Sequence, residues 1–247
     1  MLNREEIIKD IEENKIIVIL RGFSTEQLIR SVDAMEKGGI RLVEVTFDQT
    51  GATSDDTTAE YINTLKKSFE GKVRIGAGTV MTEKQVELAY HAGAEFIISP
   101  DCYESVIKKT RELGMVSIPG IFTPTEASNA HRFGADFVKL FPNSEVKVSY
   151  LKALVTPLSH IKFFAVGGVN HENMTEYFAA GAKGIGVATA IADKKSILSG
   201  DYEEITRRAK LFTSQLSSSA ITSFISLSKH FSVITVISAL LFSSKPF

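Results

Sequence analysis

The chain alternates between helical segments with one apolar face and short runs of apolar, often β-branched, residues. A glycine commonly separates a helical segment from the run that follows it. Glycine after the last helical turn supplies a left-handed cap, and a continuous apolar run is typical of a parallel strand buried on both faces. Gly71, Gly93, Gly114 and Gly134 mark four such boundaries and stand about 21 residues apart. The pattern therefore predicts a repeated helix–strand unit.

Eight strands are predicted within residues 1–216. They lie near Ile16–Leu20, Leu42–Phe47, Val73–Ala77, Phe96–Ser99, Val116–Ile118, Phe137–Phe141, Lys162–Val166 and Gly184–Val187. Polar helix-entry signals, such as Ser24-Thr25-Glu26 and Thr123-Pro124-Thr125-Glu126, separate the strands. Eight βα units predict an α/β chain with a single-domain (β/α)₈ TIM barrel, and a doubly wound open sheet is the alternative.

Composition and charge narrow the classes of partner. The formal net charge is −1 and no block of basic residues appears, so nucleic acid is not expected as a ligand. The single cysteine, Cys102, cannot form an internal disulfide, which suits a cytoplasmic protein. The charged opening from Arg4 to Lys15 lacks the apolar core of a secretory signal.

Residues 217–247 differ in composition from the rest of the chain. They are serine-rich and apolar, with only Lys229, His230 and Lys245 charged or titratable. The apolar stretch Val233–Phe242 is about half of the ~20 residues that a membrane span needs. We therefore expect a non-catalytic extension, and a membrane anchor is the less favoured interpretation.

Glu44 and Lys139 are charged residues that stand among apolar neighbours inside predicted strands. Glu44 lies within Leu42–Phe47, and Lys139 lies within Phe137–Phe141. Burying either charge alone is costly, whereas two that point into one barrel offset each other. An apolar site lowers the pKa of a lysine from ~10.4, so that the neutral amine attacks a ketone and forms an iminium. Glu44 would then transfer protons, although a structural ion pair is the alternative for each residue.

Other strand ends offer ligands at the end of the barrel where catalytic sites form. Arg21 follows the first strand and is suited to a carboxylate, and Thr79 ends the turn Gly76-Ala77-Gly78-Thr79. Gly167-Gly168 and Gly186-Val187 follow the last two strands, where barrels commonly bind phosphate.

The five histidines show no metal-ligand spacing. They are His91, His131, His160, His171 and His230. All fall in predicted helices or connections, so we expect neither a metal nor a cofactor.

At the level of motifs, residues 1–216 resemble the bacterial aldolases of 2-keto-3-deoxy-6-phosphogluconate (KDPG) and 4-hydroxy-2-oxoglutarate (KHG). The matching segments are Val18-Ile19-Leu20-Arg21-Gly22, Val43-Glu44-Val45-Thr46, Ile75-Gly76-Ala77-Gly78-Thr79-Val80, Ile98-Ser99-Pro100, Ile118-Pro119-Gly120, Thr123-Pro124-Thr125-Glu126, Val138-Lys139-Leu140-Phe141-Pro142 and Val166-Gly167-Gly168-Val169. Their order and spacing match over the whole predicted barrel.

The resemblance implies a class I, metal-free and typically trimeric aldolase that cleaves a 2-keto acid to pyruvate and an aldehyde. By motif position, Lys139 corresponds to the Schiff-base lysine, Glu44 to the acid/base and Thr79 to the pyruvate-carboxylate ligand. Gly167 and Gly168 correspond to phosphate-loop glycines. The remaining predicted substrate contacts are Arg21, Pro100, Phe141, Gly186 and Val187.

Three departures from the family pattern leave the aldehyde half open. Asp48 stands where many members carry a carboxylate-binding arginine, a role that we assign to Arg21 as a hypothesis. Val166 and Ala188 replace hydroxyl-bearing residues near the expected phosphate. Aldolases of 2-keto-3-deoxy-6-phosphogalactonate (KDPGal) also resemble the segment at residues 165–169, so glyceraldehyde 3-phosphate and glyoxylate both remain possible products.

Two other functions are compatible with the same barrel. A phosphosugar isomerase or epimerase would use acid/base groups without a covalent imine. A non-catalytic barrel would bind a keto acid or phosphate without turnover.

Overall fold

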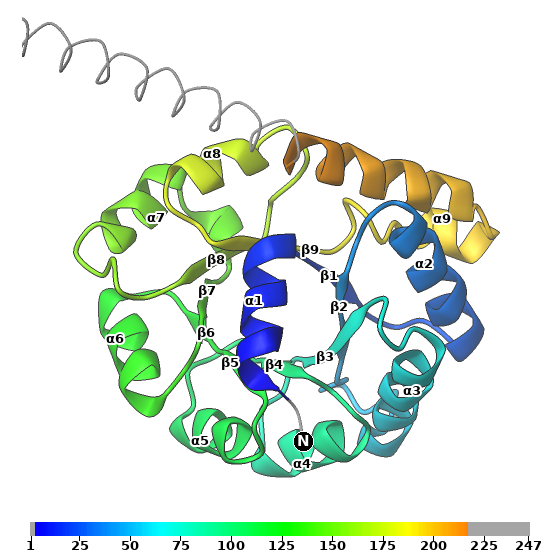
Figure 1. Cartoon of the computed structure of the whole chain (residues 1–247), viewed down its shortest axis with the longest axis horizontal. Helices are drawn as coiled ribbons and strands as arrows, with labels where there is room; N and C mark the ends of the chain where they lie inside the picture. The colour runs from blue at the N-terminus through cyan, green and yellow to red at the C-terminus, as the bar shows by residue number, and fades with distance from the viewer. Residues whose placement is uncertain (1–2, 217–247) are drawn as a thin grey trace, which may run out of the picture.

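The structure, a computed structural model, describes residues 3–216 and forms a barrel of parallel strands surrounded by helices (Figure 1). The strands are β1 (Ile16–Leu20), β2 (Leu42–Thr46), β3 (Arg74–Gly78), β4 (Phe96–Ile98), β5 (Val116–Ile118), β6 (Gly120–Ile121), β7 (Val138–Leu140), β8 (Phe163–Val166) and β9 (Gly184–Val187). This architecture confirms the predicted (β/α)₈ barrel, and the open sheet is wrong.

Most helices cover the outside of the barrel between the strands, and the first lies across one end of it. They are α1 (Arg4–Asn14), α2 (Thr25–Lys37), α3 (Asp55–Ser68), α4 (Glu83–His91), α5 (Glu104–Glu112), α6 (Pro124–Phe133), α7 (Val148–Val155), α8 (Met174–Ala179) and α9 (Lys194–Ser199), with a 3₁₀ turn η1 (Asn143–Glu145) and a final helix at 202–216. The predicted entry signals are confirmed at α2 and α6. Ser24 and Thr123 are their N-caps, and each forms a capping box.

The fifth barrel strand is divided into two pieces. Pro119 separates β5 from β6, which stand at opposite ends of the strand order. β5 pairs with β4 and β6 pairs with β7, so one continuous segment closes the barrel. Pro119 has no N–H to donate, but its carbonyl accepts the N–H of Lys139 at 2.9 Å. The nine observed strands therefore correspond to the eight predicted ones.

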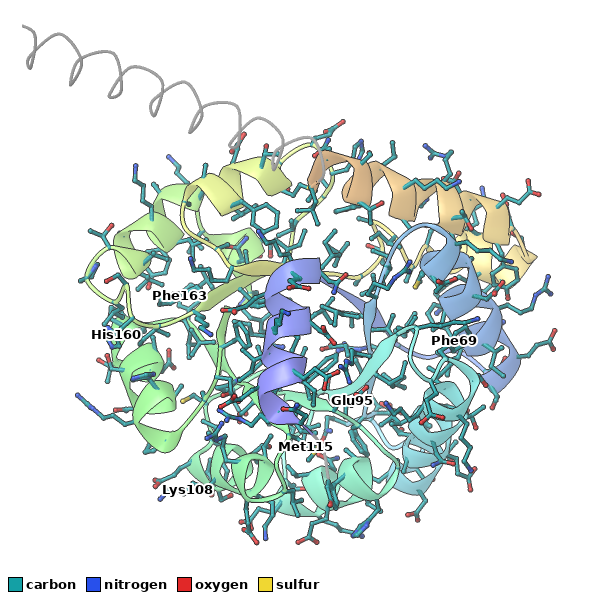
Figure 2. The ribbon with its side chains drawn as sticks, viewed as in Figure 1. Phe69, Glu95, Lys108, Met115, His160 and Phe163 are labelled. Carbon is teal, nitrogen blue, oxygen red and sulfur yellow. The ribbon has the colours of Figure 1, made fainter. Side chains whose placement is uncertain are left out.

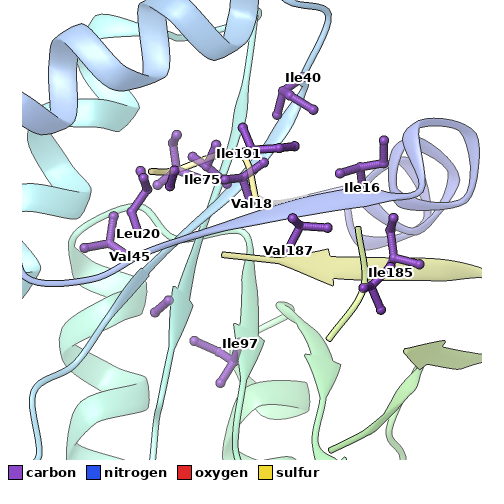
Figure 3. Close-up of a cluster of buried hydrophobic side chains, with 14 of the residues drawn as sticks. Ile16, Val18, Leu20, Ile40, Val45, Ile75, Ile97, Ile185, Val187 and Ile191 are labelled. Atoms are coloured by element: carbon purple, nitrogen blue, oxygen red, sulfur yellow. The ribbon is translucent and has the colours of Figure 1, made fainter. Parts of the chain in front are cut away.

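Alternation along each strand divides the core into two layers. On β2, Leu42 and Glu44 face the barrel interior, whereas Val43 and Val45 pack outward against the helices. Figure 3 shows this outer layer, with Val18 and Val187 among the labelled residues. The inner layer contains side chains from opposite strands and from α1: Ile7, Ile11, Ile17, Leu42, Phe96, Ile98, Val116, Ile118, Phe137, Phe164 and Val166.

Helix α1 lies across the end of the barrel at which the strands begin (Figure 1). Its Ile7 and Ile11 are buried against the inner layer. Arg74 at the start of β3 pairs with Asp10 of α1 and with Glu95, which is 1% exposed and is labelled beside α1 in Figure 2. Asp136 pairs with Arg4 of α1 in the same way. Buried acids at the strand starts thus fix α1 over this end.

No helix within residues 3–216 is long and apolar enough to cross a membrane. The extension predicted at residues 217–247, including its less favoured anchor interpretation, lies outside the described residues.

Glycines on the inner face leave room for large aromatic rings. A Cβ at Gly76 would lie 2.1 Å from the ring of Phe96, and one at Gly184 would lie 2.2 Å from the ring of Phe164. Because barrel interiors pack densely and in layers, a small residue on one strand accommodates a ring from its neighbour.

We expect Gly76→Ala to lower the free energy of unfolding by about 1–3 kcal/mol, since the added methyl overpacks the barrel interior. Chemical denaturation measures the change. The double variant Gly76→Ala with Phe96→Leu should lose less stability than the sum of the two single losses. A double-mutant cycle would then give a favourable coupling energy between the two positions. Purely additive effects would show that this contact does not limit the packing.

Candidate active site

Glu44 and Lys139 come together in the barrel interior, as predicted. β2 and β7 are the second and sixth of the eight barrel strands, so the two side chains approach from opposite walls. Glu44 is 3% exposed and Lys139 is 6% exposed. Both line a cavity of about 10 Å³ whose other walls are apolar, formed by Ile17, Ile19, Ile98, Ile118, Phe164, Val166 and Gly186. The two side chains therefore share one compartment whose other walls are apolar.

Glycine creates the space for the carboxylate. A Cβ at Gly78 would lie 2.5 Å from Oε1 of Glu44, so only glycine fits beside this side chain. The other oxygen, Oε2, is buried without a hydrogen-bond partner among the described residues. A buried carboxylate oxygen without a donor is costly, which makes Glu44 a ready acceptor for a substrate proton.

Burial shifts both titrations toward neutral pH. Desolvation raises the pKa of Glu44 to about 7, while Lys139 and Arg21 act in the lowering direction. Desolvation also lowers the pKa of Lys139; Glu44 and Asp101 oppose this shift, and Arg21 adds to it. A carboxyl that titrates near pH 7 and a lysine with a lowered pKa suit proton transfer and nucleophilic attack, respectively.

Phe141 lies beside Lys139. The ammonium nitrogen of Lys139 lies 4.8 Å from the centroid of the Phe141 ring, and Phe141 is 37% exposed. The ring therefore offers its π face to a positive charge at this position.

Arg21 connects three strand ends. It donates to Oγ1 of Thr79 at 3.0 Å and to Oγ1 of Thr46 at 3.3 Å. Thr79 has a φ of 56°, which is strained for a β-branched residue and is typical of functional positions. Thr46, which the sequence did not single out, in turn donates to the carbonyl of Leu20 at 3.4 Å.

A cavity opens beside these three residues. Its volume is about 570 Å³, in the range of small-molecule sites, and Arg21, Thr46 and Thr79 form part of its lining. Lys139 and Glu44 do not line it. Arg21 and Thr79, the predicted carboxylate ligands, and the predicted reacting pair of Lys139 and Glu44 thus line different cavities.

Asp48 organises its own loop. Its Oδ1 accepts the Thr50 N–H at 2.9 Å and the Thr50 hydroxyl at 2.7 Å, and Oδ2 accepts the Thr53 N–H at 2.8 Å. These bonds, led by that from the Thr50 backbone, lower the pKa of Asp48. Asp48 therefore shapes the wall of the cavity and leaves Arg21 as its cation.

Gly167 and Gly168 form a turn with φ values of 107° and 72°. A Cβ at Gly167 would lie 3.2 Å from the backbone nitrogen of Asn143 and 3.4 Å from that of Ser144. The fully buried Asn143, another residue that the sequence did not single out, donates its amide to the Gly167 carbonyl at 3.2 Å. The loops after β7 and β8 thus meet through backbone groups, as an anion site requires.

The other residues predicted to contact the substrate differ in where the structure places them. Gly186 lines the compartment of Lys139, and so does Val166. Val187 packs in the outer layer (Figure 3), so its side chain does not reach Lys139. Pro100 presents its carbonyl to Gly120, where a Cβ would lie only 2.2 Å away.

Within residues 3–216, no three His, Cys, Asp or Glu side chains come together in a group that could hold a metal ion.

The sequence model described as KDPG and KHG aldolase matches residues 7–208. The 2-dehydro-3-deoxy-6-phosphogalactonate aldolase of Escherichia coli K12 is 34% identical over 175 residues, covering 70% of this chain and 82% of the relative. The 2-dehydro-3-deoxy-phosphogluconate aldolase of Treponema pallidum is 31% identical over 201 residues, covering 81% and 92%. The chain belongs to the KDPG and KHG aldolase family.

The fold of this aldolase is also similar to solved structures of the same family. A native KDPGal structure superposes with a TM-score of 0.74 at 30% identity, covering 83% of this chain and 95% of the other. A KDPG aldolase from Legionella pneumophila, with pyruvate captured as a covalent carbinolamine, gives a TM-score of 0.72 at 26% identity, covering 80% and 93%. Membership confirms the predicted carbon–carbon lyase and favours it over an isomerase or a non-catalytic barrel.

We expect Glu44→Gln to become more stable relative to the parent aldolase as the pH rises from 4.5 to 7. The folded carboxyl keeps its proton up to about pH 7, whereas the unfolded one ionises near 4.5. The folded parent therefore binds more protons in this window and loses stability as the pH rises, by at most about 3 kcal/mol.

Denaturant titrations of both proteins at several pH values measure the difference. Glu204→Gln is the control, because Arg207 and Arg208 lower the pKa of that partly buried carboxyl. A constant difference between Glu44→Gln and the parent across the window would contradict the raised pKa of Glu44.

Proposed function

We propose that Lys139 forms a Schiff base with the keto group of a 2-keto acid and that Glu44 transfers the protons. The observation that carries this proposal is the pair of ionisable groups buried together in the barrel, each shifted toward neutral pH. The captured carbinolamine of the Legionella relative shows that this chemistry occurs in the family.

The reaction follows from the positions of the two groups. The neutral amine of Lys139 adds to the C2 carbonyl, and the carbinolamine takes up one proton and loses water to give an iminium. Removal of the C4 hydroxyl proton breaks the C3–C4 bond, the electron pair enters the iminium to give an enamine, and the aldehyde leaves. Protonation at C3 and hydrolysis release pyruvate and the free amine. Glu44 carries protons in these steps because its pKa lies near neutral pH.

Arg21 and Thr79 are proposed as the ligands of the substrate carboxylate. The Arg21 guanidinium already donates to the Thr79 hydroxyl oxygen, which leaves the hydroxyl hydrogen available to an anion. Asp48 is engaged with its own loop and contributes no cation. Arg21 thus takes the role that an arginine at position 48 would otherwise fill.

For the aldehyde half, we propose a phosphate that binds backbone groups of the Gly167–Gly168 turn, with Gly186 beside it. The favoured substrate is a 2-keto-3-deoxy-6-phospho-sugar acid, giving glyceraldehyde 3-phosphate; 4-hydroxy-2-oxoglutarate, giving glyoxylate, is the second candidate. Backbone N–H groups compensate for the hydroxyls missing at Val166 and Ala188. The names of the KDPGal relatives support the phosphorylated class. Pro100, Phe141 and Val187 complete the proposed contacts, the last through its backbone.

Assembly and setting are part of the same proposal. We propose a cytoplasmic homotrimer in which residues 1–216 contain the whole catalytic unit and residues 217–247 take no part in catalysis. A similar solved structure, 28% identical with a TM-score of 0.71 and covering 94% of this chain and 87% of the other, is a cage designed by fusing symmetric oligomeric domains. This supports an oligomeric barrel.

Borohydride reduction in the presence of pyruvate tests the Schiff base. We expect one pyruvyl adduct on Lys139 by intact mass and peptide mapping. It should be absent from Lys139→Met, whose unbranched side chain fills similar space, and chelators should leave its yield unchanged. A folded parent protein without an adduct on any lysine would refute the Schiff-base function.

Cleavage assays test the phosphate. We expect kcat/KM for a 6-phosphorylated 2-keto-3-deoxy-sugar acid to exceed that of its unphosphorylated form by about tenfold or more, since hydrogen bonds to a charged group each contribute roughly 1.5–3 kcal/mol. Gly168→Ala, which strains a residue at φ 72°, should reduce this preference and leave pyruvate trapping intact. Equal rates on both substrates would contradict the phosphate site.

A further inference from the structure

We propose that Asp101 is a second carboxylate of the active site and acts as the permanent counter-charge of the Lys139 iminium. It is a positioning residue, because it acts through Lys139. The proposal rests on the Schiff-base function proposed above and adds a residue to which neither the motifs nor the comparisons assign a role.

Backbone geometry places Asp101 beside the lysine strand. Asp101 follows the end of β4, and its carbonyl accepts the N–H of Gly120 at 3.0 Å. Gly120 is in turn the register partner of Lys139 in the β6–β7 pair. The close approach depends on glycine, because a Cβ at Gly120 would lie 2.2 Å from the carbonyl oxygen of Pro100. The segment after β4, the start of β6 and the middle of β7 thus place the Asp101 backbone next to the strand position that pairs with Lys139.

One oxygen of the Asp101 carboxylate lacks a hydrogen-bond donor within residues 3–216. Its Oδ1 is buried and has no hydrogen-bond partner among the described residues. Burial raises the pKa of Asp101, while Lys139 acts in the lowering direction. An unpaired buried carboxylate oxygen is unfavourable in the resting protein, so it gains most when a positive group forms next to it.

The neighbouring residue faces the other way. Cys102 directs its thiol to the carbonyl of Glu126 on α6 at 3.5 Å, and burial raises the pKa of this thiol to about 11. The Glu126 carboxylate acts on Cys102 rather than on the lysine. Within residues 3–216, the charged groups that shift the pKa of Lys139 are Glu44, Asp101 and Arg21.

The reaction needs two carboxylates with different duties. Formation of the iminium from the neutral amine consumes the ketone and one proton and releases one water, so the site gains a positive charge. Glu44 must gain and lose protons during turnover and cannot remain an anion throughout. Asp101 supplies the negative charge that persists. Loss of Asp101 should therefore disfavour the iminium at pH values where Lys139 starts as a neutral amine.

Asp101→Asn tests the proposal in the full-length chain. The first measurement is the pH dependence of Lys139 acetylation by acetic anhydride without substrate, followed by peptide mass. We expect the midpoint to move to lower pH by about one unit, the effect of removing a nearby opposite charge. The second measurement is borohydride trapping with subsaturating pyruvate. At pH values above the midpoint, the yield of trapped adduct in Asp101→Asn should be several-fold below that of the parent. At pH values below the midpoint, the two yields should be similar.

Two variants separate charge from structure. Asp48→Asn removes a carboxylate at the same end of the barrel, one whose oxygens already have partners, and should leave the midpoint unchanged. Asp101→Glu keeps the charge and should return the midpoint toward the parental value. If Asp101→Asn does not fold, Asp101→Ser removes the same charge and carries the same expectation.

An unchanged Lys139 midpoint in a folded Asp101→Asn protein would overturn the proposal. Equal shifts in Asp101→Asn and Asp101→Glu would overturn it as well, because the effect would then be structural. In either case, normal trapping of pyruvate on Lys139 of the parent would leave the Schiff-base function standing. Absence of trapping in the parent would instead refute that function.

Discussion

The site depends on the placement of one carboxylate and one amine inside an apolar barrel. Neither Glu44 nor Lys139 would be buried alone, because a single charge in that environment is strongly unfavourable. Together, their opposite charges offset part of the cost of desolvation. The pKa of each group nevertheless remains shifted toward neutral pH. The same burial that reduces stability shifts both pKa values in the directions that nucleophilic attack by the amine and proton exchange by the carboxyl would require. Stability is therefore exchanged locally for reactivity.

The interior is arranged around that pair. Glycines at positions 76, 78 and 184 remove side chains where Phe96, Glu44 and Phe164 need space. A glycine on one strand thus lies beside a large side chain of the neighbouring strand. The Glu44 carboxylate fills the space beside one of these glycines, Gly78. The result is a compartment with apolar walls around the pair. Arg21 and Thr79 lie outside it and line the larger cavity.

Much of this arrangement was predictable from the sequence. The glycine-bounded apolar runs gave the strands to within one or two residues, because parallel barrel strands are buried on both faces. Glu44 and Lys139 could be found because charge is rare in such runs. The division of the fifth strand was missed, since Gly120 and Ile121 directly follow Pro119 and resemble the start of a loop. Thr46, Asn143 and Asp101 were also missed: polar residues at strand ends are common, and only the fold shows which groups they contact.

The position of α1 has a further consequence for how the protein tolerates change. Its apolar residues and the acids that fix it, Glu95 and Asp136, lie where the strands begin, whereas the reacting groups and their mouth lie toward where the strands end. Substitutions that tighten the α1 end can raise thermal resistance without moving an atom of the chemistry. Loops at the opposite end can vary to accept new aldehydes while the barrel keeps its closure. The two ends can thus evolve, or be engineered, as separate traits of one chain.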